Sequence, residues 1–340
     1  MTTSTPAVAG AGPSQTPDSR GWKPPTRWPS WASRGTLGLP VFFVIIIVFF
    51  SVSNAAFLTP ANATSILRAA APLAIAAIGA TIVLIAGGID ISQGPLMACA
   101  AVTSVALIAH GGLPEGMAIV LALLVGLTLG LVNGLASEAF KIPAFIATLA
   151  VGFIVRGVLF LYTDSRSIGL PPDQGGFLRW LGGGSVGPIP VAVLFAALLT
   201  ALFVLVMRFT PWGLHSYGVG SSAEASRIAG VKVGRQRVSV YMVAGLLSAV
   251  AGLVIAGRLG SAGAGFAPGA EFDIITAAVL GGTSIYGGRG SVARTILGAI
   301  VLATLANGLI VLNVPSFYQS VVVGSVLLIA LGLEGWRRRR

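Results

Sequence analysis

Long apolar runs separated by short polar stretches dominate the pattern of this chain. A helix that crosses a bilayer needs about 20 mostly apolar residues, and ten runs approach or reach that length. They are Leu37–Asn54, Leu67–Ala86, Leu96–Ala109, Met117–Ala136, Ala144–Tyr162, Val191–Phe209, Val240–Gly257, Ile274–Ile285, Val292–Leu312 and Tyr318–Leu333. The pattern therefore predicts an all-α integral membrane protein with about ten transmembrane helices. The third and eighth runs are short, so we expect them to be tilted into glycine-rich ends or to be partly re-entrant.

Composition supports the membrane assignment and excludes other classes. Hydrophobic residues make up 55% of the chain and charged residues only 9%, whereas a soluble domain has about 25% charged residues. The net charge of +11 does not indicate nucleic-acid binding, because the basic residues sit in short loops and tails between apolar runs. Cys99 is the single cysteine, which excludes an intrachain disulfide and argues against redox or zinc chemistry.

The distribution of Lys and Arg predicts the orientation. With an even number of spans both termini share one side of the membrane, and that side holds 16 of the 21 basic residues. These are Arg20, Lys23, Arg27, Arg34, Lys141, Arg208, Arg227, Lys232, Arg235, Arg237, Arg289, Arg294 and 337–340. Because cytoplasmic loops are enriched in Lys and Arg, we expect both termini in the cytoplasm and the Asp164–Pro188 loop outside.

The same reading divides the chain into segments. Residues 1–35 are rich in Ser, Thr, Pro, Gly and Ala, which predicts a disordered cytoplasmic tail. Residues 36–336 form the ten-helix domain, with a cytoplasmic loop at 210–239, and residues 337–340 form a basic cytoplasmic tail.

Motifs for catalysis are missing. The sequence contains no G-x-x-x-x-G-K-[ST], so it has no P-loop for nucleotide phosphates, and its two histidines are isolated in sequence. We expect no catalytic residues, no metal and no cofactor bound by this chain. The buried ionisable candidates are Asp90, Arg156 and Asp273, a set that favours a passage over a catalyst.

The longest cytoplasmic connection, Thr210–Ser239, contains a predicted short helix. Ser221 can cap it while Glu224, three residues later, reaches back to the Ser221 amide, and Gly230 is a natural C-terminal stop. Ser221–Ala229 should therefore be helical. A soluble partner could grip such a helix, but an amphipathic helix lying on lipid headgroups would show the same pattern.

Two glycine-containing stretches predict breaks near the inner face. Gly281 and Gly282 precede Thr283 and Ser284, and a second glycine pair precedes Arg289. This stretch predicts either a helix break or an ordinary tight turn between two spans.

The other stretch is "IAGGIDISQGP", in which Gly87 and Gly88 precede Asp90. The second span should run inward and end near Gly87, which places Asp90 in a tight connection before Pro95 starts the next helix. Asp90 could accept hydrogen bonds from backbone amides freed by the glycines, or it could take part in transport.

Several of these stretches resemble one family. "GGIDIS", "VNGL" at Val132–Leu135, "KIPAFIATLAVGFIVRG" from Lys141, "YGVGSSAEASRIAGV" from Tyr217 and "EFDIITAAVLGGTSIYGGRGSV" from Glu271 are similar to motifs of the permease subunits of bacterial ATP-binding-cassette importers for ribose, xylose, galactose and related simple sugars. The resemblance covers about residues 60–330, and the last stretch is its most specific part.

The resemblance implies the fold, the partners and the sites. It implies a ten-helix permease in the bacterial cytoplasmic (inner) membrane that meets lipid, pairs with a second permease chain, and works with a cytoplasmic ATPase that holds ATP-Mg and with an extracytoplasmic solute-binding protein. The ATPase-coupling helix would comprise Ser221, Ser222, Glu224, Ala225, Arg227 and Gly230. Ser222 and Ser226 depart from the family pattern, which often has Asn and Ala there. Candidates for helix breaks and transport are Gly87, Gly88, Asp90, Asn133, Asp273, Gly281, Gly282, Thr283, Ser284 and Arg289. With such a partner, the role of Asp90 could also be in signalling to the ATPase. The solute would be a simple sugar or polyol.

Two other classes remain open. A stand-alone ion-coupled carrier could use Asp90 or Asp273 as its proton or sodium site. A membrane-bound enzyme is disfavoured because no cluster of catalytic groups is visible.

Overall fold

The computed structural model describes residues 38–315, 318–319, 321–322, 324–326 and 328–329. The predicted tails at 1–35 and 337–340 lie outside the described residues, and so does part of the tenth predicted span. The chain divides into Met1–Gly38 and Leu39–Arg340, and the packing described below belongs to the second unit.

Each of the first nine predicted runs contains a helix. The helices are α2 (Gly38–Ser53), α3 (Pro60–Ile85), α4 (Gln93–Ala109), α5 (Glu115–Ala139), α6 (Ala144–Thr163), α8 (Val191–Phe209), α11 (Val233–Leu259), α12 (Ala270–Leu280) and α13 (Val292–Val311). In the described residues six of them, α3, α5, α6, α8, α11 and α13, are long and apolar enough to cross a membrane. The all-α membrane fold is thus confirmed, while the number of ten spans stays a prediction.

Three predicted boundaries are wrong by several residues, each for a local reason. The helix predicted at Leu67 begins at Pro60, because the Thr59 side chain accepts a hydrogen bond from the Asn62 amide and proline suits the first helical position. The helix predicted at Val240 begins at Val233, because its first two turns are polar and escape a hydropathy criterion. The run predicted at Ile274–Ile285 is helical only to Leu280.

Helix α12 is too short to cross a bilayer alone. Its 11 residues rise about 16 Å at 1.5 Å per residue, against a hydrocarbon core of about 30 Å. Gly269 and Gly282 bound it with φ angles of +75° and +85°, a left-handed conformation that glycine adopts without steric cost. The helix thus ends at the first glycine pair, and an irregular segment from Gly281 to Ser291 connects it to α13, which fits either a helix break or a turn between two spans.

Helix α11 lies at the centre and packs against α3, α4 and α5. Three glycines spaced four apart on α5 face it. A Cβ added at Gly126 would lie 2.7 Å from the Gly245 carbonyl oxygen, and one at Gly134 would lie 2.8 Å from the Val238 Cα. Gly130 would meet the Tyr241 carbonyl in the same way. The glycine repeat thus serves close packing between helices of one chain.

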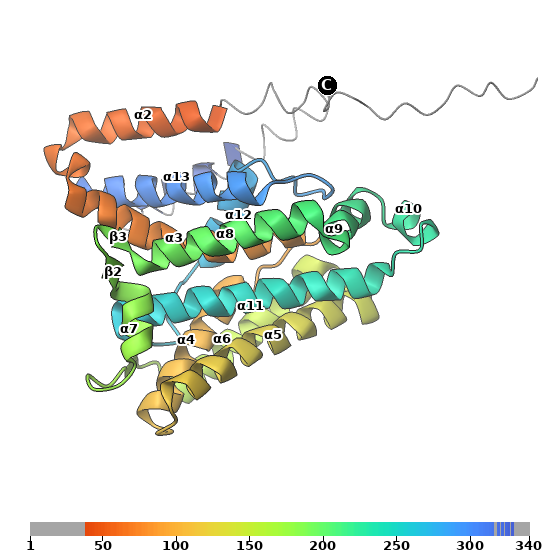
Figure 1. The fold of residues 1–340 in the computed structure, drawn as a ribbon, viewed down its shortest axis with the longest axis horizontal. Coiled ribbons are helices and arrows are strands. Elements are labelled where there is room, and N and C mark those ends of the chain that lie inside the picture. Colours follow the sequence, from red (N-terminus) through yellow and green to blue (C-terminus); the bar gives the residue numbers. More distant parts are fainter. Residues whose placement is uncertain (1–37, 316–317, 320, 323, 327, 330–340) are drawn as a thin grey trace, which may run out of the picture. The chain divides into compact units, whose positions relative to one another are not determined.

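Short elements fill the end of the molecule opposite α9 (Pro211–Ser221) and α10 (Ala223–Ile228) (Figure 1). They are η1 (Ala55–Leu58), β1 (Ile168–Gly169), α7 (Gly176–Gly183), β2 (Ser185–Val186), β3 (Ile189–Pro190) and β4 (Ser261–Ala262). Strand β1 pairs antiparallel with β4, and β2 pairs antiparallel with β3. The Glu115 carboxylate accepts hydrogen bonds from the first amides of α7 at 2.6 and 3.1 Å. The predicted outer loop is thus an ordered layer.

Charge is unequal between the two ends. Within the described residues the α10 end holds eight basic residues: Lys141, Arg208, Arg227, Lys232, Arg235, Arg237, Arg289 and Arg294. The opposite end holds four: Arg68, Arg166, Arg179 and Arg258. This asymmetry agrees with a cytoplasmic α10 end, an orientation that stays a prediction.

Candidate functional site

Helix α10 is present, but its cap differs from the prediction. Ser221 is the last residue of α9, and Ser222 is the N-cap, with extended backbone and a side chain that accepts the Ala225 amide at 3.1 Å. The predicted capping box of Ser221 and Glu224 is therefore wrong. Helix α9 begins at Pro211 with Thr210 as its N-cap, and it continues through Ser221. A box built on Ser222 would need its acid at Ala225.

The far end of α10 agrees with the sequence. Gly230 has φ +85°, its amide donates to the Arg227 carbonyl at 3.0 Å, and the Val231 amide donates to the Ser226 carbonyl at 2.9 Å. This pair of bonds is the Schellman ending that glycine permits. Helix α10 is thus short and capped at both ends.

The outer face of α10 presents both charge and apolar surface. Glu224 forms an ion pair with Arg227, and both side chains are more than 60% exposed, so the pair contributes only about 0–1 kcal/mol to stability. Ile228 is 81% exposed. An isoleucine held out on a rigid, charged helix is a suitable anchor for a partner protein.

Helix α9 is fixed to the membrane domain. The Gln236 amide nitrogen donates to the Trp212 carbonyl and to the Ser216 hydroxyl, each at 2.9 Å, and the Trp212 indole donates to the Ser239 hydroxyl at 2.8 Å. These bonds tie α9 to the start of α11, so α10 is attached to the spans through a rigid helix.

A second tie joins α9 to the segment before α13. The Tyr217 hydroxyl donates to the Gly290 carbonyl at 3.1 Å. Burial raises the pKa of this phenol above its ordinary value, and the charge of Arg294 lowers it by less. The hydroxyl therefore stays protonated and remains a donor at neutral pH.

Four glycines from three segments meet at the end of α9, and we call Gly87, Gly220, Gly287 and Gly288 the glycine junction. A Cβ added at Gly287 would lie 2.9 Å from the Gly87 Cα, and one at Gly220 would lie 2.7 Å from the Gly288 nitrogen. The Gly288 amide donates to the Ile85 carbonyl at 2.8 Å. The end of α3, the end of α9 and the second glycine pair are thus in direct backbone contact.

Asp90 and Asn133 belong to one buried polar cluster, joined by Ser92. The Asp90 Oδ1 accepts the Ser92 amide at 2.9 Å and the Ser92 hydroxyl at 2.6 Å. The Asn133 side-chain nitrogen donates to the same hydroxyl at 2.7 Å. The Asp90 Oδ2 and the Asn133 Oδ1 are buried without a hydrogen-bond partner in the described residues.

Two further side chains near the start of α4 have buried polar atoms. Gln93 is fully buried, and neither polar atom of its side chain has a hydrogen-bond partner in the described part of the chain. The Glu271 Oε2 is also buried without one, and it lies where a Cβ on Gly94 would be. Buried polar atoms without a hydrogen-bond partner are costly to stability.

The remaining predicted residues lie apart from the cluster. Asp273 is half-buried on α12, and no hydrogen bond or ion pair joins it to Asp90 in the described residues. Gly281 packs against the Thr295 backbone, and Thr283 is buried. The Ser284 amide donates to the Arg289 carbonyl at 2.9 Å, which closes the turn.

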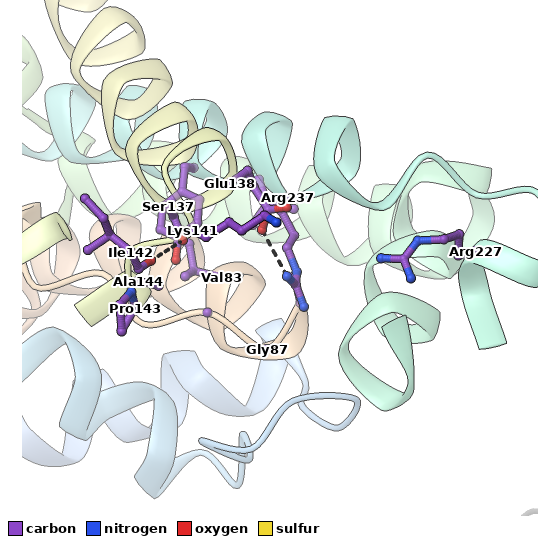
Figure 2. A pocket seen from close by; sticks show the side chains of 14 residues that line it. Val83, Gly87, Ser137, Glu138, Lys141, Ile142, Pro143, Ala144, Arg227 and Arg237 are labelled. Carbon is purple, nitrogen blue, oxygen red and sulfur yellow. Dashed lines mark hydrogen bonds and ion pairs between the residues drawn. The ribbon is translucent and has the colours of Figure 1, made fainter. Parts of the chain in front are cut away.

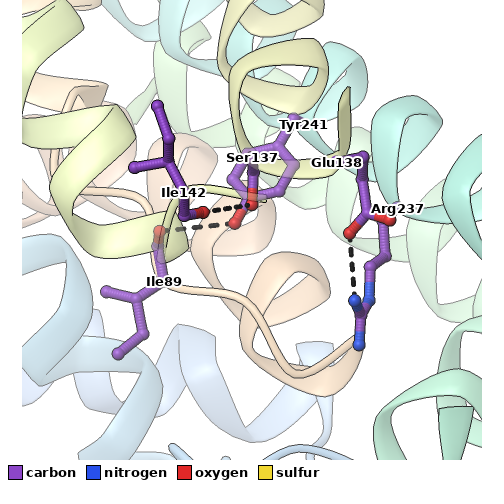
Figure 3. A network of polar contacts seen from close by, with 6 residues as sticks. All are labelled: Ile89, Ser137, Glu138, Ile142, Arg237 and Tyr241. Atoms are coloured by element: carbon purple, nitrogen blue, oxygen red, sulfur yellow. Dashed lines mark hydrogen bonds and ion pairs between the residues drawn. The ribbon is translucent and has the colours of Figure 1, made fainter. Parts of the chain in front are cut away.

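Figure 3 shows how α11 holds the neighbouring segments. The Tyr241 hydroxyl donates to the Ile89 carbonyl at 3.4 Å, and Arg237 forms an ion pair with Glu138 of α5 at 3.0 Å. The connection that contains Asp90 is thus held by α11 at the end where α10 lies. No group of three or more His, Cys, Asp or Glu side chains in the described part of the chain could hold a metal ion.

Sequence reasoning missed several members of these arrangements. Ser92 had a local signal, because Asp-x-Ser is a common hydrogen-bonded turn, whereas Gln93 is not part of that turn. Gly220 and Glu271 had none, because their importance comes from contacts with segments far away in sequence.

Comparisons with known proteins agree on one family. The model of a family described as branched-chain amino acid transport system / permease component matches residues 62–331. The chain is 40% identical to the ribose import permease protein RbsC of Bacillus subtilis (strain 168), over 87% of this chain and 91% of that one. It is 39% identical to the probable ABC transporter permease protein YphD of Escherichia coli (strain K12), over 87% and 88%. It is 31% identical to the xylose transport system permease protein XylH of the same strain, over 90% and 94%. No solved structure matches the chain.

Proposed function

Because the chain belongs to the family of branched-chain amino acid transport system permease components, in which its relatives include ribose and xylose permeases, we propose that it forms the translocation path of an ATP-driven importer for a simple sugar or related polyol. It is a multi-pass membrane permease, a transport subunit. ATP-Mg, the energy source, would be bound by a separate cytoplasmic ATPase.

The observation that supports coupling to an ATPase is the α9–α10 unit. Helix α10 projects beyond the spans, is capped at both ends and exposes Ile228. Helix α9 connects it through hydrogen bonds to α11 and through the glycine junction to α3 and the segment before α13. A displacement imposed on α10 by a partner would therefore be passed to several spans together.

The polar cluster around Asp90 fits a passage that need bind its solute only weakly. An extracytoplasmic solute-binding protein would supply affinity and selectivity, and a second permease chain would complete the path. Both termini would lie in the cytoplasm, with the Asp164–Pro188 layer facing the binding protein.

The test is reconstitution with the ATPase and the binding protein encoded beside this gene. We expect uptake of a sugar into proteoliposomes only with all components and ATP. Replacing Ile228 with aspartate should lower co-purification of the ATPase about tenfold or more, as loss of a central apolar anchor does. The conservative Ile228→Val variant is the matched control and should behave as wild type.

The same preparation tests the carrier alternative, which the unpaired Asp90 oxygen keeps open. Uptake by the chain alone under a proton or sodium gradient would establish a stand-alone carrier and contradict the proposed dependence on ATP. Normal co-purification of the Ile228→Asp variant would show that α10 is not the docking helix.

A further inference from the structure

A basic cavity lies beside α10, at the end of α3. Its volume is about 520 Å³, and its walls come from the end of α3, the connection between α5 and α6, α10 and α11 (Figure 2). Three cationic side chains line it, Lys141, Arg227 and Arg237, against one carboxylate, Glu138. The lining therefore has an excess of two positive charges.

The basic groups of this cavity have unused hydrogen-bonding capacity. Arg237 uses one terminal nitrogen for its 3.0 Å ion pair with Glu138, and its Nε is buried without a partner in the described residues. Lys141 takes part in no hydrogen bond or ion pair within the described part of the chain. Among the described residues, the solvent-exposed Glu224 is the one ionic partner of Arg227.

Two positively charged side chains extend toward the same cavity. In Figure 2, Arg237 extends from α11 and Arg227 extends from α10 toward it, so two guanidinium groups line the same cavity. Their repulsion is relieved by an anion between them, and a guanidinium matches the geometry of phosphate oxygens.

The residues beside the cavity indicate the source of an anion that it could bind. Phe140 and Ile142, on either side of Lys141, are 75% and 38% exposed, and Phe145 is 47% exposed. Exposed aromatic and aliphatic side chains around a lysine are typical of a segment at the level of lipid headgroups. Basic pockets between helices on the cytoplasmic side suit anionic headgroups.

We propose that this cavity binds the phosphate of an anionic phospholipid from the inner leaflet, with Lys141, Arg237 and Arg227 as its ligands. The inference rests on the proposed orientation of the α10 end. A bound phosphate would bridge α10 and the α5–α6 connection, so lipid composition would influence the position of the coupling helix.

The test is lipid binding by the full chain, purified in detergent and observed by native mass spectrometry. Phosphatidylglycerol and phosphatidylcholine with the same acyl chains are added separately, and the preference for the former is measured. Replacing Lys141 with glutamine should reduce that preference about fivefold, the effect expected of one basic side chain beside an anionic lipid surface. Lys232→Gln is the control, because Lys232 is exposed at the same end but does not line the cavity.

A double variant, Arg237→Gln with Glu138→Gln, removes the partly buried ion pair and leaves the net charge of the lining unchanged. It should still reduce the preference, because the guanidinium that binds the phosphate is lost. Equal losses in the Lys141 and Lys232 variants would show diffuse surface attraction and overturn the site. If millimolar inorganic phosphate abolishes the preference and stabilises lipid-free protein as phosphatidylglycerol does, the ligand is soluble phosphate and the lipid assignment fails. Displacement of the lipid by the ATPase would also overturn it. If the chain prefers phosphatidylglycerol but does not transport, the lipid site is supported while the proposed function fails.

Discussion

Replacing Gly220 with alanine tests whether the glycine junction is a tight contact between α9 and two other segments. The added Cβ would meet the Ile85 carbonyl oxygen and would lie 2.7 Å from the Gly288 nitrogen. Both neighbours are backbone atoms, so neither can move aside as a side chain would. These two atoms are also the partners of the 2.8 Å hydrogen bond that closes the junction.

The free-energy cost follows from these contacts. Inserting a methyl group into a packed site costs about 1–3 kcal/mol, and losing the Gly288–Ile85 hydrogen bond costs about 0.5–1.5 kcal/mol. Alanine in place of glycine within helix α9 returns roughly 0.5–1 kcal/mol. The junction should therefore be destabilised by roughly 0.5–4 kcal/mol, which corresponds to an opening equilibrium raised about 2- to 900-fold.

Hydrogen exchange of the Gly288 amide measures that opening directly, because this amide is the donor in the bond. We expect faster exchange at Gly288 in Gly220→Ala and, with the partner ATPase, weaker coupling of hydrolysis to uptake. Gly157→Ala is the control, because nothing lies within 4 Å of a Cβ at Gly157. Exchange at Gly288 as slow as in the control variant would refute the tight-contact reasoning.

Three further predictions follow from the corrected cap, the topology and the polar cluster. Ser222→Ala should weaken α10 by about 0.5–2 kcal/mol, the cost of a lost N-cap, and should reduce ATPase co-purification, whereas Ser221→Ala should not; equal effects would contradict the assigned cap. A single cysteine at Ser167 in a Cys99→Ala background should be labelled by an impermeant thiol reagent from outside the cell, and labelling only from the cytoplasmic side would reverse the orientation. Asp90→Asn keeps an oxygen acceptor for the amide two residues on, so uptake should persist. Loss of uptake in a variant that folds normally would show that transport requires the charge.

Hydropathy predicted most of the fold because lipid imposes it. The run at Val191–Phe209 matches α8 at both ends, and the run from Ala144 matches α6 to within one residue. Hydropathy failed where a helix extends beyond the apolar run. The starts of α3 and α11 are polar, so hydropathy does not find them. The Thr-Pro pair before α3 is an N-cap signal, which hydropathy does not measure.

The candidate site was predictable only in part. The sequence marked Asp90, Asn133 and the glycine pairs separately, but the bond that joins Ser92 to Asn133 depends on how α5 packs beside α4. The cap was misassigned because Ser221 and Ser222 are both good N-caps. The choice between them depends on where α9 ends, which its contacts with α11 and the glycine junction help to determine.

The contacts of α9 explain why glycine is needed on all three sides of the junction. Gly87, Gly287 and Gly288 have φ angles of +80°, +88° and +72°, which other residues adopt only with strain. Gly220 is in an ordinary helix, so its requirement is steric rather than conformational. The junction is a contact between backbone atoms, so no flexible side chain can adjust when α9 moves. A shift of α9 must therefore move the end of α3 or break the bond to Gly288. The connection that contains Asp90 begins at the end of α3, so a motion received at α10 would reach the polar cluster through a rigid contact.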